Sequence, residues 1–195
     1  DLLELKLKEM KKEGRVPDAI TFAGNGEPTI HPHFAGIVND TIALRDEYFS
    51  DAAITVLSNA SMLRKREVFE ALLKVENNIQ KLDAGTEELF QLINQPSGGL
   101  HLEGIVKDLE RFNGKVIIQT LFLKAVYNGK IIDNTTQEEV EAWIGLLKRI
   151  KPEYVMIYPI DRQDPEQKIG KIPFTQLEEI AAMVNREGIL TKIFG

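Results

Sequence analysis

The most informative part of the sequence is Ala19–Pro32, which reads AITFAGNGEPTIHP. A short apolar, β-branched and aromatic run changes abruptly to two glycines, a glutamate and a proline, which predicts a strand ending in a tight loop. Gly24 and Gly26 have no Cβ, so the backbone there can come close to a ligand. Pro28 favours an extended conformation at Glu27. A carboxylate held among backbone carbonyls and amides suits the capture of a cationic amine.

Other glycine-rich loops fit this stretch less well. A dinucleotide-binding Gly-x-Gly-x-x-Gly loop would need a third glycine at position 29, where the chain has Thr29. A phosphate-binding loop would need a Gly-Lys-Ser/Thr step, and Gly26 is followed by Glu27. A plain surface turn is the simpler alternative.

Length and charge bound the class of protein. The 195 residues suffice for one α/β domain, and we expect a single domain over residues 1–195. No run approaches the roughly 20 apolar residues of a membrane span. The beginning of the chain has the pattern of a charged amphipathic helix rather than of a signal peptide, so we expect a cytoplasmic protein. The net charge of −6 disfavours a large nucleic-acid footprint.

The sequence contains no cysteine. Disulfides are therefore excluded, and so is an iron–sulfur cluster held by thiolates of this chain. His31 and His33 have a spacing that could bind a metal, but the proline between them and the lack of cysteine argue against it. His101 is expected on the surface of a helix.

The rest of the chain alternates between strand-like and helix-like apolar spacing. Strands are expected at 19–23, 51–61, 78–85, 115–124, 154–160 and 189–194, and the continuously apolar 115–124 should be covered on both faces. Helices are expected before Gly14, over 34–49, 65–75 and 100–112, after Thr86, and after capping boxes at 136–139 and 175–178. This alternation implies βαβ units and a parallel sheet of about six strands, either a partial (β/α) barrel or a doubly wound open sheet.

The loop at 24–28 resembles the Gly-Gly-Glu-Pro motif of radical S-adenosylmethionine (SAM) enzymes, with Asn25 at the usual first glycine. Followed by His-Pro, it is most similar to the Fe-S oxidoreductase branch that includes wyosine-synthesising enzymes and lies near glycyl-radical activases. Further along, Lys81-Leu82-Asp83-Ala84 resembles the branch's Ser-Leu-Asp-Ala, and Ile93-Asn94-Gln95-Pro96 resembles its Ile-Asn-Arg-Pro. The departures are Lys81 in place of a serine, Gln95 in place of an arginine, and the missing cluster cysteines.

The resemblance implies a partial (β/α)6 TIM-like barrel. Members of the family carry Cys-x3-Cys-x2-Cys just after their first strand, ahead of the helix that precedes the motif strand. The chain begins at Asp1, inside what resembles that helix, so we expect a fragment without the first strand and cluster loop. The alternative is a relative that never held a cluster. With the first strand missing, the strand at 19–23 would lie at an exposed edge.

The resemblance also implies a reaction. In this family a [4Fe-4S] cluster binds SAM, and one-electron reduction cleaves it to methionine and a 5'-deoxyadenosyl radical that abstracts hydrogen from a substrate. The implied partners are an unknown substrate and an external electron donor such as flavodoxin or ferredoxin. Without the cluster cysteines, this chain alone is expected to be inactive and to contribute no catalytic residue.

Polar residues follow the expected strands at their C-terminal ends, where the working groups of parallel α/β folds lie. The candidate cofactor-binding residues are Gly24, Asn25, Gly26, Glu27, Pro28, Ser58, Asn59, Lys81, Asp83, Gln119 and Tyr158, and Asp161 is a further strand-end acid. The resemblance implies that Glu27 binds the amino group of SAM, that Lys81 pairs with its carboxylate and that Asp83 bonds its amine or hydroxyls. It gives Ser58-Asn59 a contact with the methionine moiety or the substrate.

Simpler roles are open for several of these residues. Lys81 and Asp83 could form an internal ion pair. Ser58-Asn59 could cap the next helix, and Gln119 could bond only to neighbouring backbone.

Two other functions stay open. The chain could be a cluster-free SAM-binding, nucleotide-binding or regulatory module on the same barrel. It could also be a barrel hydrolase or aldolase, with Lys81 as the Schiff-base candidate.

Overall fold

The computed structural model describes residues 2–24, 26–160, 169–170 and 172–194. Asn25 and Asp161 therefore lie outside the described residues. The helices are α1 (Leu2–Lys12), α2 (Phe34–Tyr48), α3 (Arg66–Leu72), α4 (Glu87–Asn94), α5 (Leu102–Glu110), α6 (Gln137–Ile150) and α7 (Phe174–Arg186), with a 3-10 turn η1 (Pro28–Ile30). The strands are β1 (Ala19–Phe22), β2 (Ala53–Ser58), β3 (Asn77–Lys81), β4 (Ile117–Phe122), β5 (Lys124–Tyr127), β6 (Lys130–Asp133), β7 (Tyr154–Pro159), β8 (Ile169–Gly170) and β9 (Thr191–Ile193).

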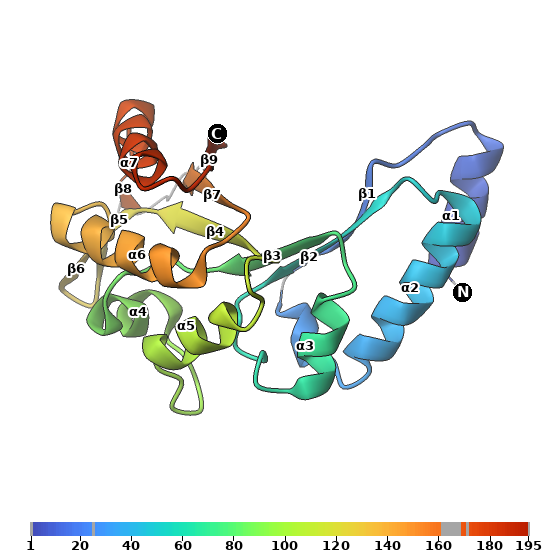
Figure 1. Ribbon diagram of the computed structural model, residues 1–195, viewed down its shortest axis with the longest axis horizontal. Coiled ribbons are helices and arrows are strands. Elements are labelled where there is room, and N and C mark those ends of the chain that lie inside the picture. The colour runs from blue at the N-terminus through green and yellow to red at the C-terminus, as the bar shows by residue number, and fades with distance from the viewer. Residues whose placement is uncertain (1, 25, 161–168, 171, 195) are drawn as a thin grey trace. The chain divides into compact units, whose positions relative to one another are not determined.

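The main sheet has six strands in the order β1-β2-β3-β4-β7-β9 (Figure 1). The pairs β1–β2, β4–β7 and β7–β9 are parallel. The strands follow one another in chain order, whereas a doubly wound sheet reverses its order at a switch point. The partial, TIM-like barrel arrangement is therefore confirmed and the doubly wound alternative is wrong. Within the described residues β1 ends the sheet, as expected for an edge strand.

Contacts divide the chain into two compact units, Asp1–Ile79 and Gln80–Gly195. In the first unit, α1 packs on α2 and contributes Leu7 to a small core with Phe49 and Ala52. Gly14 follows α1 with a φ of +69°, a backbone conformation that suits glycine. The expectation of one domain over the whole chain stays a prediction.

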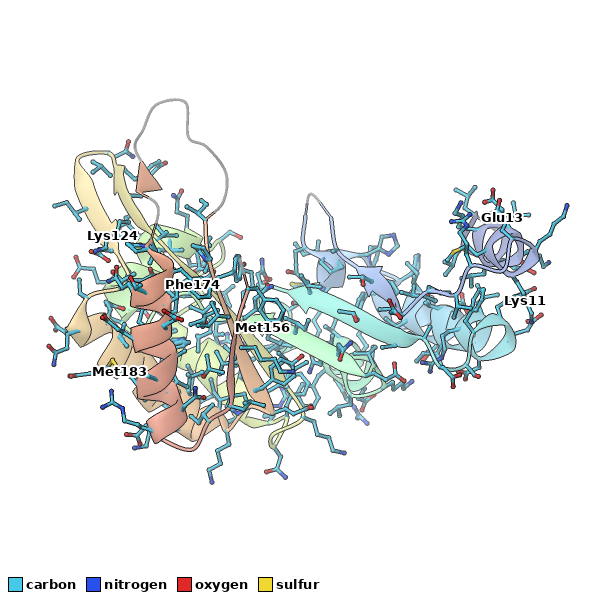
Figure 2. The ribbon with its side chains drawn as sticks, turned by 90° about the horizontal axis from the view of Figure 1, so that it is seen from above. Lys11, Glu13, Lys124, Met156, Phe174 and Met183 are labelled. Carbon is cyan, nitrogen blue, oxygen red and sulfur yellow. The ribbon has the colours of Figure 1, made fainter. Side chains whose placement is uncertain are left out.

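In the second unit, alternate residues of β4 and β7 form a buried layer. Ile118 lies opposite Val155 and Thr120 opposite Ile157, and all four are buried. α7 packs on β7 and β9, and Figure 2 shows α7, labelled at Phe174 and Met183, on the other side of these strands from Met156. On the Met156 side of β4, Ile117 is buried but Gln119 and Leu121 are only half-buried. The expectation that 115–124 is covered on both faces therefore holds at Ile117 and is wrong at Gln119 and Leu121.

A hairpin that we did not expect follows β4. β5 and β6 pair antiparallel, and β8 adds to β5 in a second sheet of order β6-β5-β8. The turn is Asn128-Gly129, with φ of 50° and 75°. An Asn-Gly step between short apolar runs is the strongest local hairpin signal, so the sequence did contain this information.

The two expected capping boxes turn out differently. Thr136 caps α6 by accepting the amide of Glu139 at 3.3 Å, but the Glu139 carboxylate bonds to the loop after β3 instead of the helix. The expectation of a second capping box at 175–178 is wrong, because α7 begins earlier, directly after Pro173, and has no side-chain cap. Pro173 already supplies the extended backbone that leads into the helix.

Within the described part of the chain, none of the helices combines the length and the apolar character needed to cross a membrane.

Candidate functional site

The loop after β1 holds its carboxylate in a defined position. Glu27 is extended, with φ −91° and ψ 112°, as the following proline predicts. Its Oε1 accepts hydrogen bonds from the amide of Thr29 at 3.1 Å and from the Thr29 hydroxyl. Its Oε2 accepts the amide of Asn59 at 2.6 Å. One side chain therefore joins the loop after β1 to the loop after β2.

The packing and backbone of the described residues do not require glycine at positions 24 and 26. A Cβ added at Gly24 or Gly26 would meet no atom of the described residues within 4 Å. Neither glycine has the left-handed backbone conformation that favours glycine. Both are exposed. Their lack of a side chain therefore leaves bare backbone open to an approaching molecule.

The loop after β2 is held by its own side chains. Ser58 is buried and its Oγ accepts the amide of Ala60 at 3.1 Å, while the Oδ1 of Asn59 accepts the amide of Ser61 at 3.0 Å. Ala60 has a φ of 64°, in the left-handed region. Lys65 is the residue that precedes α3 at the cap position. Ser58-Asn59 thus fixes its own turn, and the helix-cap alternative is wrong.

The second candidate pair lies at the end of β3. Lys81 Nζ is 3.1 Å from Asp83 Oδ2, and Asp83 Oδ1 accepts the amide of Leu121 at 2.8 Å. The Asp83 side chain is 2% exposed and that of Lys81 is 34% exposed. Asp83 lies beyond the strand, which ends at Lys81. The internal ion pair is therefore formed, and the Lys81 side chain stays partly exposed to solvent.

Burial and charge shift the ionisation of this pair in characteristic directions. Burial raises the pKa of Asp83, against the opposing effects of the Lys81 ammonium and the Leu121 amide. Burial lowers the pKa of Lys81, but the negative charges of Asp83 and ionised Tyr158 outweigh it and the net shift is upward. Burial raises the pKa of Tyr158, and Lys81 opposes that shift. Lys81, Asp83 and Tyr158 are thus within electrostatic reach of one another.

The loop that carries Asp83 is anchored by side chains from β4, from α6 and from the loop after β6. The Leu82 carbonyl accepts from Thr120 Oγ1 at 2.8 Å and from Trp143 Nε1 at 3.2 Å. Asn134, which is 3% exposed, donates from Nδ2 to the Asp83 carbonyl at 2.9 Å. Glu139 accepts the amide of Gly85 at 2.9 Å. Sequence reasoning missed Asn134 and Glu139 as members of this region.

The other residues singled out from the sequence make contacts with neighbouring parts of the chain. Gln119 is half-buried, and its backbone carbonyl accepts the amide of Leu82. Gln95 ends α4 in the left-handed conformation, with its amide bonded to the Gln91 carbonyl. His101 is exposed and bonds Glu87 at 2.9 Å, as expected of a surface histidine.

The structure offers little for a protein-held metal. His31 Nδ1 accepts the amide of His33 at 3.1 Å. Among the described residues there is no group of three or more histidine, aspartate or glutamate side chains that could hold a metal ion.

Solved structures with a similar fold include a radical SAM methyltransferase from Sphaerobacter thermophilus, with a TM-score of 0.68 at 15% identity over 96% of this chain and 54% of that one. A domain of pyruvate-formate lyase-activating enzyme from Bacteroides vulgatus superposes with a TM-score of 0.68 at 18% identity, over 91% of this chain and 99% of that one. The chain has the radical SAM fold. Streptococcus suis SuiB bound to S-adenosylmethionine gives a TM-score of 0.68 at 16% identity, over 99% of this chain and 43% of that one.

The sequence relatives carry different names from the structural neighbours. A protein named GTPase Obg from Brachyspira hyodysenteriae is 26% identical over 183 residues, which cover 92% of this chain and 25% of that protein. A UPF0026 protein from Synechocystis is 30% identical over 155 residues, 77% of this chain and 53% of that protein. The chain thus spans a quarter to about half of these relatives. No protein-family profile matches it.

The residues present fit one cofactor of the radical SAM fold and not the other. A carboxylate has about four acceptor positions, and the described residues occupy three of those on Glu27, so one ammonium hydrogen of SAM can still be accepted. The exposed backbone at Gly24 and Gly26 leaves room for that approach. A thiolate-held cluster does not fit, because the 195 residues contain no cysteine.

Proposed function

We propose that this chain binds S-adenosylmethionine as the core of a radical SAM oxidoreductase. The observation that carries the proposal is the Glu27 carboxylate, held by two loops at the end of β1 in a chain with the radical SAM fold. In the proposal the Glu27 carboxylate accepts a hydrogen bond from the SAM ammonium group and does not exchange a proton with the substrate. SAM held there would supply a 5'-deoxyadenosyl radical for hydrogen abstraction only if a reduced cluster from outside these residues provided the electron.

The chain's own contribution is binding and orientation. Ser58, Asn59, Lys81, Asp83, Gln119 and Tyr158 stay predicted contacts of SAM or substrate. Lys81 offers an ammonium to a carboxylate, because its pKa is raised and it keeps its proton. The same fact disfavours the aldolase alternative, since a Schiff-base lysine needs a neutral amine. The cluster, its electron donor, such as flavodoxin or ferredoxin, and the substrate belong to the proposal as components that these residues do not supply.

Alanine at Gly24 or Gly26 tests the proposal. We expect SAM affinity to fall at least about tenfold, because a methyl group would stand where the ligand approaches bare backbone. The free energy of unfolding should stay the same or rise by up to about 1 kcal/mol, since the described chain leaves space for each Cβ. Calorimetric titration with SAM and urea unfolding measure the two effects. Unchanged SAM affinity in both variants would argue against contact at this loop.

A second function is favoured by the absence of cysteine, namely a cluster-free SAM-binding or nucleotide-binding module. The complete gene product, reconstituted anaerobically with iron and sulfide, separates the two. Formation of a cluster and of 5'-deoxyadenosine from SAM identifies the enzyme. SAM binding without a cluster identifies the module.

A further inference from the structure

Thr29 directs both of its polar groups at one oxygen of Glu27. It is 1% exposed and is the only residue of η1 that is fully buried. Its amide lies 3.1 Å from Glu27 Oε1, and its hydroxyl donates to the same atom. A buried hydroxyl is unfavourable unless it is hydrogen-bonded. Burial of the Thr29 hydroxyl is therefore coupled to the position of the glutamate.

Two donors on Oε1 restrict rotation of the carboxylate group. With Oε1 held by Thr29, Oε2 is turned toward the loop after β2 and accepts the Asn59 amide at 2.6 Å. The acceptor position that the described residues leave on the carboxylate is then on Oε2. Without the hydroxyl, Oε1 would keep a single bond of 3.1 Å and the carboxylate could rotate.

We infer that Thr29 is a positioning residue for Glu27, which turns the remaining acceptor site of Oε2 toward the ligand's ammonium group. The inference rests on the proposed function, because it takes the SAM ammonium as the group that Oε2 receives. It adds a residue outside the Gly24–Pro28 loop to the determinants of SAM affinity. It also makes the Asn59 amide a reporter of how well the carboxylate is held.

The first test needs no ligand. Thr29→Val removes the hydroxyl and keeps the shape of the side chain, and Thr29→Ser keeps the hydroxyl. We expect hydrogen exchange of the Asn59 amide to become about tenfold faster in Thr29→Val, because the Glu27 carboxylate that accepts this amide is then held less firmly. Thr29→Ser should keep the exchange rate of the unmodified protein. The matched control is Thr41→Val, which removes another buried threonine hydroxyl of the same unit, one that donates to the Ile37 carbonyl and has no link to Glu27 among the described contacts. Exchange rates are compared after correction for global stability.

The second test measures SAM affinity of the same variants. We expect affinity to fall about tenfold in Thr29→Val and to be unchanged in Thr29→Ser and Thr41→Val. Unchanged exchange at Asn59 in Thr29→Val would overturn the inference, and so would faster exchange with full SAM affinity. If exchange responds as expected but the unmodified protein binds no SAM, the proposed function fails while the role of Thr29 in holding Glu27 stands.

Discussion

Replacing Gly85 with alanine is expected to destabilise the protein by about 3 kcal/mol. A Cβ at this position would run into the backbone of α6, at the Glu139 carbonyl oxygen and the Trp143 nitrogen. Backbone atoms of a packed helix cannot move aside cheaply. The loop would have to shift, which would also stretch the 2.9 Å bond from the Gly85 amide to Glu139.

Urea unfolding of Gly85→Ala measures this effect, and Gly145→Ala is the matched control. Gly145 lies inside α6, its added Cβ would meet no described atom within 4 Å, and it is exposed. Alanine there should stabilise the helix by about 0.5–1 kcal/mol. Similar stability changes in the two variants would show that the loop after β3 is not closely packed on α6.

Replacing Lys81 with methionine is expected to cost about 3 kcal/mol of stability at pH 7. The substitution leaves Asp83, 2% exposed, without its cation, while the amide of Leu121 still donates to it. Loss of the Lys81 ammonium, which lowers the pKa of Asp83, should raise that pKa further above its ordinary value.

The effect of Lys81→Met should depend on pH with a definite sign. Burial raises the folded-state pKa of Asp83 above the unfolded value of 3.8, so the folded state holds the proton more tightly. The stability that protonated Asp83 contributes is fully present below the unfolded-state pKa of this carboxyl group. It is lost as the pH rises through the folded-state pKa. The deficit of Lys81→Met relative to the unmodified protein should therefore shrink toward pH 4. The double variant Lys81→Met/Asp83→Asn should recover much of the loss at pH 7, and a deficit that is constant with pH would contradict this account.

The parallel α/β class was predictable because it follows from local patterns, whereas the choice of a barrel over a doubly wound sheet came from the family resemblance. The alternation of apolar strands and amphipathic helices from β2 to α7 needs only the period of each segment. The Gly24–Pro28 loop carried the family resemblance, and solved structures support the fold that the resemblance implied. The β5–β6 hairpin was equally local in origin, and its Asn128-Gly129 turn was available to the same reasoning.

The contacts that build the candidate site could not be read from spacing. Glu27 and Asn59 are 32 positions apart, and Asn134 and Asp83 are 51 apart. Only the folded chain shows which amide a carboxylate finds. Glu139 illustrates the limit, because Thr136–Glu139 has the pattern of a reciprocal capping box while its carboxylate bonds Gly85 instead. Local signals thus predicted the strands and loops but not the bonds between them.

The most direct measurement of the central claim is calorimetric titration of SAM into the unmodified protein, Glu27→Gln and Glu70→Gln. Glu70 is an exposed glutamate of the same unit that pairs with Arg66, so its variant controls for loss of a negative charge. We predict SAM binding by the unmodified protein and Glu70→Gln, and at least about tenfold weaker binding by Glu27→Gln, because a charge-assisted bond to the ammonium is lost. No SAM binding by the unmodified protein, or equal affinity in all three proteins, would contradict the account.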